Sequence, residues 1–185
     1  MSDARDPIEA AGTCATSASS WTDRLRDGSL VRIRPLCAAD AELELDFLAR
    51  CSPQSRRQRF LGTVQPTMDL ARSLTRIDRE NDLAFVALFD PHGQERVDGI
   101  SRCHVDPGKR SAECAVLVCD DMQGKGLAVL LMRHLIELAR MRGLSELVSI
   151  DSASNHGMRE LASFLGFDRR SDPGDTTQVI HTLKL

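Results

Sequence analysis

An apolar strand that leads through a glycine-rich loop into an amphipathic helix constrains this chain more than any other feature. From Cys114 to Cys119 the residues are apolar and rich in valine, which favours a buried strand. Gly124 and Gly126 follow, and a helical series then runs up to Gly143, a helix stop. The series consists of Leu127, Leu130, Leu131, His134, Leu135, Leu138 and Met141. A strand, a tight loop and a helix are therefore expected in direct succession.

The start of that helix is suited to an anionic group. Gly124 and Gly126 lack a Cβ atom, so the backbone can take unusual dihedral angles and a ligand can approach closely. The first N–H groups of a helix have no partner inside it, and the helix dipole adds partial positive charge. The loop therefore favours a diphosphate, and the alternative is a tight turn with two glycines.

Two well-known phosphate loops do not match. A P-loop requires GxxxxGK[ST], whereas Lys125 lies between two glycines and Gly126-Leu127 follows it. A dinucleotide fingerprint requires GxGxxG, whereas the chain reads Gly124-x-Gly126-x-Ala128.

The loop resembles a different motif. Gln123-Gly-Lys-Gly-Leu-Ala128 after a valine-rich strand is similar to the Q/R-x-x-G-x-G/A acetyl-CoA motif of the GNAT acyltransferases. The segment from Asn155 to Phe167, with its leading Asn and terminal Leu-Gly-Phe, resembles the last GNAT helix. The likeness runs from about Leu30 to Leu185. Within the superfamily it is greatest to the Pat-type protein lysine acetyltransferases of bacteria.

The resemblance implies an α/β (α+β) GNAT fold, with a mixed central sheet of six to seven strands flanked by about four helices. We assign 1–28 to a flexible N-terminal segment and 29–185 to the acetyltransferase domain, since 185 residues suit one domain. Patterns along the chain predict strands at 30–34, 83–89, 97–105, 111–119, 147–150 and 177–183. They predict helices at 40–50, from 53, at 68–77, 127–142 and 155–165.

By resemblance, acetyl-CoA is the co-substrate and the main chain of Val116, Leu117 and Val118 binds its pantetheine arm. The diphosphate loop would consist of Gln123, Gly124, Lys125, Gly126, Leu127 and Ala128. Asn155 would donate a side-chain hydrogen bond to the pantetheine, or else serve as a helix N-cap. Lys125 would reach the phosphates, or else lie in solvent.

Glu113 is the candidate general base. A lysine amine has a reference pKa of about 10.4, so a proton must leave before its nitrogen attacks a thioester. Glu113 matches the position of the glutamate base in Pat-type enzymes, and partial burial would have to raise its pKa. The alternative is a charged residue on a solvated strand face. Many GNAT enzymes protonate the leaving thiol with a tyrosine, but this chain contains none, and Ala162 occupies the matching position.

We therefore expect an N-acetyltransferase that transfers acetyl directly to a primary amine, with a protein lysine as the leading acceptor. A polyamine or antibiotic amine is the second candidate. A non-catalytic acyl-CoA-binding regulatory domain is the third, because the glycine loop serves binding as well as turnover. The oligomeric state, a homodimer included, is left open.

Composition excludes other classes. A net charge of -3 and a sequence pI near 6.0 provide no basic field for nucleic acid, and Arg56, Arg57 and Arg59 are expected on a solvated helix face. No apolar run approaches the roughly 18 residues that a membrane span needs. Residues 1–28 do not resemble a secretory signal. Six cysteines without a CxxC pair favour a reducing cytoplasm.

The remaining histidines and cysteines are assigned structural roles. His104 is a lesser candidate for a proton relay, and His134 is expected to pack on the helix. Cys114 and Cys119 are interpreted as small buried hydrophobes rather than reactive thiols. No cluster has metal-ligand spacing, so no metal is predicted.

Overall fold

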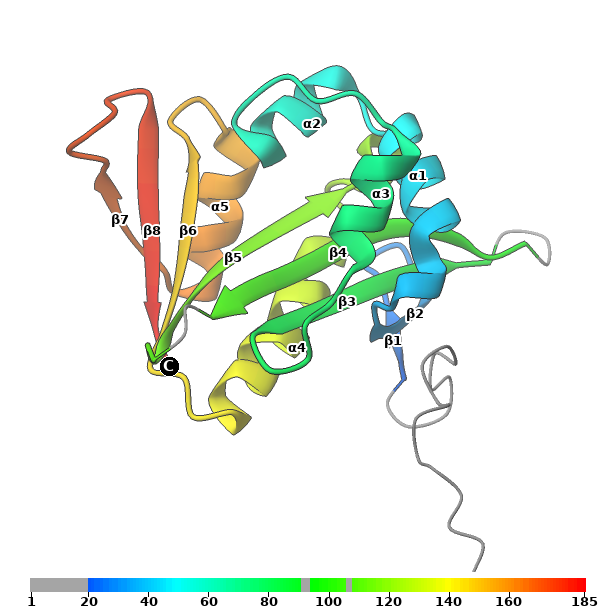
Figure 1. Ribbon diagram of the computed structural model, residues 1–185, viewed down its shortest axis with the longest axis horizontal. Helices are drawn as coiled ribbons and strands as arrows, with labels where there is room; N and C mark the ends of the chain where they lie inside the picture. The colour runs from blue at the N-terminus through cyan, green and yellow to red at the C-terminus, as the bar shows by residue number, and fades with distance from the viewer. Residues whose placement is uncertain (1–19, 91–93, 106–107) are drawn as a thin grey trace, which may run out of the picture.

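The computed structural model describes residues 20–90, 94–105 and 108–185 (Figure 1). The strands are β1 Trp21–Arg24, β2 Leu30–Pro35, β3 Asp82–Phe89, β4 Arg96–Val105, β5 Ser111–Val118, β6 Glu146–Ser152, β7 Asp168–Ser171 and β8 Gln178–Lys184. The α-helices are α1 Ala41–Arg50, α2 Pro53–Phe60, α3 Met68–Thr75, α4 Leu127–Met141 and α5 His156–Leu165. Together they form a mixed α/β fold, the class that the sequence predicts.

The eight strands form one sheet in the order β1-β2-β3-β4-β5-β6-β8-β7. All six predicted strands are present, and the two additional ones are β1 and β7 at the ends of the sheet. β1 lies inside the segment 1–28 that the sequence analysis assigned to a flexible terminus. Trp21 in this strand contacts the rings of Phe85 and His134 at centroid distances of 5.5 and 4.6 Å. The folded domain therefore begins before residue 29, while 1–19 lie outside the described residues.

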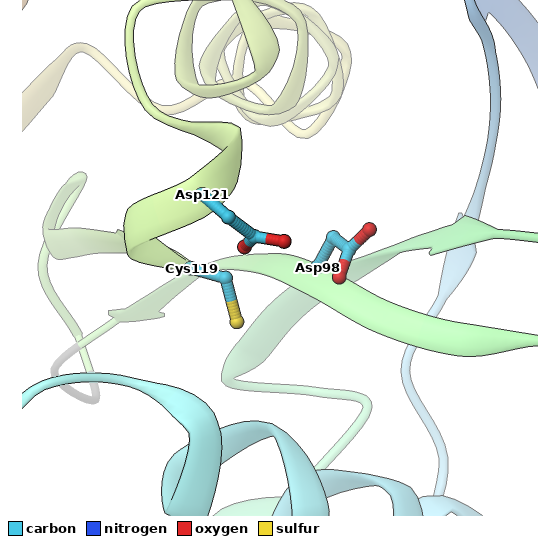
Figure 2. Close-up of side chains that lie close together, drawn as sticks. All are labelled: Asp98, Cys119 and Asp121. Carbon is cyan, nitrogen blue, oxygen red and sulfur yellow. The ribbon is translucent and has the colours of Figure 1, made fainter. Parts of the chain in front are cut away.

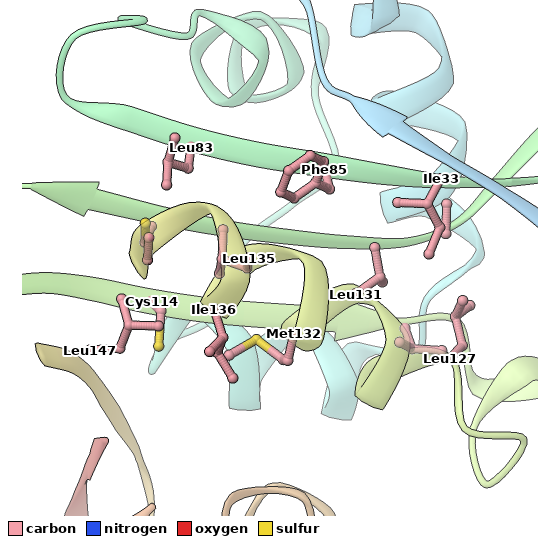
Figure 3. Close-up of a cluster of buried hydrophobic side chains, with 14 of the residues drawn as sticks. Ile33, Leu83, Phe85, Cys114, Leu127, Leu131, Met132, Leu135, Ile136 and Leu147 are labelled. Carbon is pink, nitrogen blue, oxygen red and sulfur yellow. The ribbon is translucent and has the colours of Figure 1, made fainter. Parts of the chain in front are cut away.

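Two helical layers cover the sheet. Alternate side chains of each strand point to opposite faces. On one face, α4 and α5 pack over a core built around Phe85, Leu131 and Leu147 (Figure 3). On the other face, α1, α2 and α3 cover a smaller core around Phe47, Leu48 and Val86. Each core separates one face of the sheet from water, which fixes the register of the strands.

Local sequence signals explain where the helices begin and end. Ser52 accepts a hydrogen bond from the Ser55 N–H at 3.1 Å, and Pro53 occupies the first turn of α2. Gly166 ends α5 with a φ of 83°. The sequence analysis predicted the helix start at Pro53 and the helix end at 165, but not the caps at Ser52 and Gly166. Within the described residues, no helix combines the length and the apolarity that crossing a membrane would require.

The strands β5 and β6 lie side by side only where they begin. They run parallel, and their pairing covers Ser111 to Glu113 of β5 and Glu146 to Val148 of β6. Beyond this point the two strands diverge toward α2, as Figure 1 shows. β5 remains paired to β4 as far as Val118. One edge of β5 is therefore open from Cys114 onward.

The helix α1 buries one of its own carboxyl groups, that of Glu44. Glu44 is 4% exposed, and its Oε2 atom has no hydrogen-bond partner. Burial raises the pKa of Glu44 to about 7; Arg102 and Arg59 oppose this rise and Asp40 adds to it. In the unfolded chain the same carboxyl titrates near the reference value of about 4.3. At a pH between these two values, Glu44 therefore takes up a proton on folding.

This difference predicts a loss of stability as pH rises. Between about pH 4.5 and 7 the unfolded chain has released the Glu44 proton and the folded chain retains it, so the free energy of unfolding falls by on the order of 2 kcal/mol. Glu44→Gln removes this component. Urea unfolding at pH 5 and pH 8 measures it, and an equal fall in both proteins would contradict the assignment.

Candidate acetyl-transfer site

Two cavities meet at Glu113. The first has a volume of about 590 Å³ and lies between the open edge of β5, the start of α4 and the helix α5. The second has a volume of about 530 Å³ and lies under α2 and α3, against β3 and β4. Both are lined by Arg59, Glu113, Cys114 and Ala115. This arrangement allows two molecules to enter from different sides and react at one place. We call the first the cofactor cavity and the second the acceptor cavity.

The register of β4 and β5 shows which main-chain groups face the cofactor cavity. Gly99 pairs with Val118, and the Cys119 N–H donates to the Asp98 carbonyl at 2.9 Å. Because directly opposed residues alternate between bonded and non-bonded pairs, Leu117 bonds to β4. The amides of Val116 and Val118 then point to the open edge. Of the three predicted residues, these two offer main-chain groups to a ligand, and Leu117 lines the cavity without doing so.

The glycine loop forms the far end of the cofactor cavity. Gly124 and Gly126 have φ angles of 74° and 91°, in the left-handed region that favours glycine. The first intrahelical bond of α4 runs from the Leu130 N–H to the Gly126 carbonyl at 3.2 Å. The amides of Leu127, Ala128 and Val129 precede that bond and lie at the cavity. A helix start of this kind attracts an anion, as the sequence analysis expected.

The loop is held in place by α2. The Asp120 carboxylate accepts hydrogen bonds from the Ser52 N–H and hydroxyl at 2.8 and 2.7 Å, and from the Ser55 hydroxyl at 2.9 Å. Burial opposes ionisation of Asp120, but these hydrogen bonds hold its pKa below the ordinary value. The Gln123 side chain donates to the Val118 carbonyl at 3.2 Å, which ties the loop to β5. Gln123 therefore holds the loop against the end of β5.

The helix α5 closes the other side of the cofactor cavity. The Asn155 Oδ1 atom accepts a hydrogen bond from the Met158 N–H at 3.1 Å, so Asn155 is an N-cap. Its amide nitrogen remains available to a ligand, because the residue also lines the cavity. Ala162 is 1% exposed and packs in the core. No hydroxyl therefore stands at the position where many GNAT enzymes carry their tyrosine.

Arg26 lines the cofactor cavity although no motif indicates it. It lies between β1 and β2, and its N–H donates to the Lys125 carbonyl at 3.0 Å. Its side chain passes 3.4 Å from the place where a Cβ of Gly126 would stand. For Lys125 the sequence analysis left open a phosphate contact or a place in solvent. Its ammonium approaches Asp27 at 3.7 Å, and the residue is not part of the cavity wall. A basic side chain thus stands at the loop, from a hairpin that is distant in sequence.

Glu113 is exposed and lies on the face of the sheet that α2 covers. Among the described residues, no hydrogen bond or ion pair holds its carboxylate. Arg59 lies half-buried at the same junction. Burial lowers the pKa of its guanidinium to about 10, and the positive charge of Arg102 makes a smaller contribution to this fall. The carboxylates of Glu44, Glu113 and Asp151 oppose this fall. Glu113 therefore stands free, beside a cation, where the two cavities meet.

The arginines of α2 do not form the solvated face that we expected. Arg57 is exposed, but Arg56 is buried, and its guanidinium donates to the Leu48 carbonyl at 2.9 Å and to the Cys51 carbonyl. Arg59 reaches the junction of the cavities. Hydrophobic periodicity does not predict the burial of Arg56 and Arg59, because it counts arginine as polar although the stem of its side chain packs as an apolar group does.

One group among the described residues has ligand atoms close enough for a metal, namely Asp98, Cys119 and Asp121 (Figure 2). Guanidinium groups already hold its carboxylates. Arg50 and Arg96 contact Asp98 at 3.1 and 3.0 Å, and Arg96 contacts Asp121 at 3.0 Å. The Arg50 guanidinium also donates to the Cys119 Sγ at 3.3 Å. These contacts favour an ion-pair network that ties α1 to the end of β5.

The histidines and cysteines singled out in the sequence have structural contacts. His134 meets the Asp23 carboxylate at 2.7 Å and packs against Trp21, and His104 meets the Asp82 carboxylate at 2.7 Å. Cys114 and Cys119 are buried, and burial raises the pKa of the Cys114 thiol. The Sγ atoms of Cys119 and Cys51 are 3.7 Å apart. Burial of Cys114 and Cys119 agrees with their interpretation as small hydrophobes.

Comparison with known proteins identifies the family. The model of the acetyltransferase (GNAT) family matches residues 50–167. The chain is 42% identical to acetyltransferase PA5475 of Pseudomonas aeruginosa over 186 residues, covering 100% of both chains. It is 27% identical to acetyltransferase Pat of Mycolicibacterium smegmatis over 77% of this chain and 43% of that one. The crystal structure of the GNAT domain of S. lividans PAT superposes with a TM-score of 0.81 at 24% identity, covering 90% of this chain and 97% of that one. This chain therefore belongs to the GNAT acetyltransferase family.

Proposed function

We propose that the protein binds acetyl-CoA and transfers the acetyl group to the side-chain amine of a protein lysine, with Glu113 as the general base. The observation that supports this most is the meeting of two cavities at an exposed carboxylate without a partner. One cavity has the loop and the open strand edge that suit a coenzyme. The other leaves room for an acceptor.

The cofactor cavity fits the parts of acetyl-CoA in order along its length. The amides of Leu127, Ala128 and Val129 would hold the diphosphate at the start of α4. The exposed main-chain groups of Val116 and Val118 would bind the pantetheine as an additional strand does. The acetyl group would then lie near Ala115 at the junction of the cavities.

The reaction follows from this placement. Glu113 accepts the proton of the lysine ammonium, directly or through a water, and the neutral nitrogen attacks the thioester carbonyl carbon. Main-chain N–H groups at the open edge of β5 stabilise the negative oxygen. The carbon–sulfur bond then breaks and the thiolate leaves, and the second proton that the nitrogen loses as the amide forms passes to the thiolate, directly or through water. A thiol of pKa near 8.5 is a fair leaving group, so the absence of a tyrosine at Ala162 does not prevent transfer.

Arg26 adds charge to the diphosphate end of the cofactor cavity, so Arg26→Gln is expected to weaken acetyl-CoA binding about fivefold at low salt. The difference should shrink at high salt, because the side chain is exposed and its charge is screened. Isothermal titration at two ionic strengths measures this. Equal affinity of both proteins at low salt would remove Arg26 from the site.

Mass spectrometry tests the acceptor class. The protein is incubated with acetyl-CoA and either a cell lysate or a panel of polyamines and antibiotic amines. Acetylated lysines in proteins are the expected result. Modification of the small amines without any protein would favour the second candidate, a small-amine acetyltransferase.

The buried Ala162 favours one further candidate, a regulatory domain that binds acyl-CoA without turnover, because it leaves the site without the usual acid. A thiol-release assay beside the titration separates the two. Tight binding without thiol release above background, on any acceptor, would support the regulatory domain.

A further inference from the structure

The acceptor cavity is lined by an excess of basic side chains. Arg59 of α2, Arg76 at the end of α3 and Arg102 of β4 all line it. The acidic side chains that line it are Asp82 and Glu113. Three arginines and two acidic residues thus line a cavity of about 530 Å³, and the Arg102 guanidinium also donates to the Leu74 carbonyl. A cavity that receives an amine would not be expected to carry this charge, because like charges repel.

One of the two carboxylates of the cavity is already engaged. Asp82 meets His104 at 2.7 Å and accepts the Asp78 N–H at 2.8 Å. Glu113 would pair with the incoming lysine ammonium before it accepts a proton from that group. Once the amine is bound, Asp82 remains as the acidic side chain of the cavity wall, and it is shared between His104 and Arg102.

Acidic groups behind the cavity wall neutralise two of the arginines in part. Glu44 acts on Arg102 and Arg59, but burial raises its pKa to about 7, so it is only partly ionised at neutral pH. The carboxylate of Asp151, which lines the cofactor cavity, attracts the positive charge of Arg59. Arg76 is exposed, and no ion pair engages it among the described residues. Arg76 therefore contributes to the cavity wall a charge without an ion-pair partner among these residues.

The segment that contains α2 and α3, which lie over the acceptor cavity, is basic as well. From Pro53 at the start of α2 to Arg76 the chain contains five arginines and one acidic residue, Asp69, although the net charge of the whole protein is -3. Arg56 is buried among main-chain carbonyls, and the other four reach the surface or the cavity. A local positive field of this kind attracts acidic macromolecules and repels polycations.

We propose that the acceptor is a lysine flanked by acidic residues, whose carboxylates are bound by Arg76 and Arg102 while the amine reaches Glu113. This rests on the proposed function, because it specifies which lysines that site acetylates. Arginine suits the task, since its planar guanidinium forms two parallel hydrogen bonds with a carboxylate. The same charges would disfavour a polyamine, which brings several positive groups into the cavity.

Three peptides test the proposal. They share one central lysine and differ in the residues on both sides, which are glutamate, glutamine or arginine. Thiol release gives kcat/KM for each at constant acetyl-CoA. We expect the acidic peptide to exceed the neutral one by about tenfold, and the basic peptide to be the poorest. The acidic preference should shrink as salt rises.

Two variants connect the preference to the cavity. Arg76→Glu should abolish or invert the order of the acidic and basic peptides, while the affinity for acetyl-CoA stays unchanged. Arg170→Glu makes the same change of charge on the exposed strand β7; it is the matched control and should retain the order. Equal kcat/KM for all three peptides, or an unchanged order in Arg76→Glu, would overturn the inference and leave lysine acetylation intact. Absence of thiol release with every peptide and protein would instead overturn the proposed function, and the inference with it.

Discussion

Glu113→Gln is expected to lower the turnover number about a hundredfold at neutral pH and to leave the affinity for acetyl-CoA unchanged. Glutamine has nearly the same shape but cannot accept the proton of the lysine ammonium. The defect should diminish toward pH 10, where much of the lysine amine is already neutral. Thiol release measured across this pH range, with titration of acetyl-CoA as the second measurement, tests both statements.

A matched control separates catalysis from general charge effects. Glu137→Gln changes an exposed glutamate on α4 that lines neither cavity, and its turnover should equal that of the unmodified protein. If Glu113→Gln lowers turnover less than about tenfold at neutral pH, below the usual effect of acid–base catalysis, Glu113 is not the base. The carboxylate would then be a solvated charge at the sheet surface.

Gly126→Val should reduce the affinity for acetyl-CoA by about a hundredfold. The φ angle of 91° is strained for any residue with a Cβ, and a β-branched residue tolerates it least. The new side chain would also stand 3.4 Å from Arg26 and obstruct the approach to the first amides of α4. Isothermal titration gives the affinity directly.

Gly143→Val, at the other end of α4, is the control for the effect of backbone strain alone. Gly143 has a φ of 73°, and nothing lies within 4 Å of its missing Cβ, so it introduces similar strain away from the cavity. Both variants should lose comparable stability, and only Gly126→Val should lose affinity. If Gly143→Val binds acetyl-CoA as poorly as Gly126→Val, the loss reflects general destabilisation.

The central strand, loop and helix could be predicted from sequence because their signals are local. Apolar periodicity places β5 and α4, and the glycines place the turn between them at positive φ. The same holds for α2 and α5, whose starts are readable at Pro53 and Asn155. The proposed cofactor side of the site is built from these elements, so most of the residues proposed for it could be named in advance.

The acceptor side could not be predicted, because it depends on contacts between distant segments. Arg59, Arg76 and Arg102 belong to three elements and come together only through the packing of α2 and α3 on the sheet. Arg26 reaches the loop from the β1–β2 hairpin, and β1 itself is too short and polar to show a strand pattern. A charged residue has no periodic signature of its own, so its role depends on tertiary structure.

Leu117 and Lys125 show the limit of reasoning by motif. A resemblance assigns residues in a run, but a strand offers the main-chain groups of alternate residues to each edge, so Val116 and Val118 face the cavity and Leu117 bonds to β4. Lys125 follows the glycine that turns the loop, and its side chain lies toward Asp27. The fold therefore refines the set of residues that the motif suggests.

Isothermal titration of coenzyme A against pantetheine tests the central claim most directly, because only coenzyme A carries the diphosphate. We claim that main-chain amides at the start of α4 hold this group. The folded protein should bind one molecule of coenzyme A, about a hundredfold more tightly than pantetheine. Equal affinity for the two ligands, or no heat of binding with coenzyme A, would contradict the account.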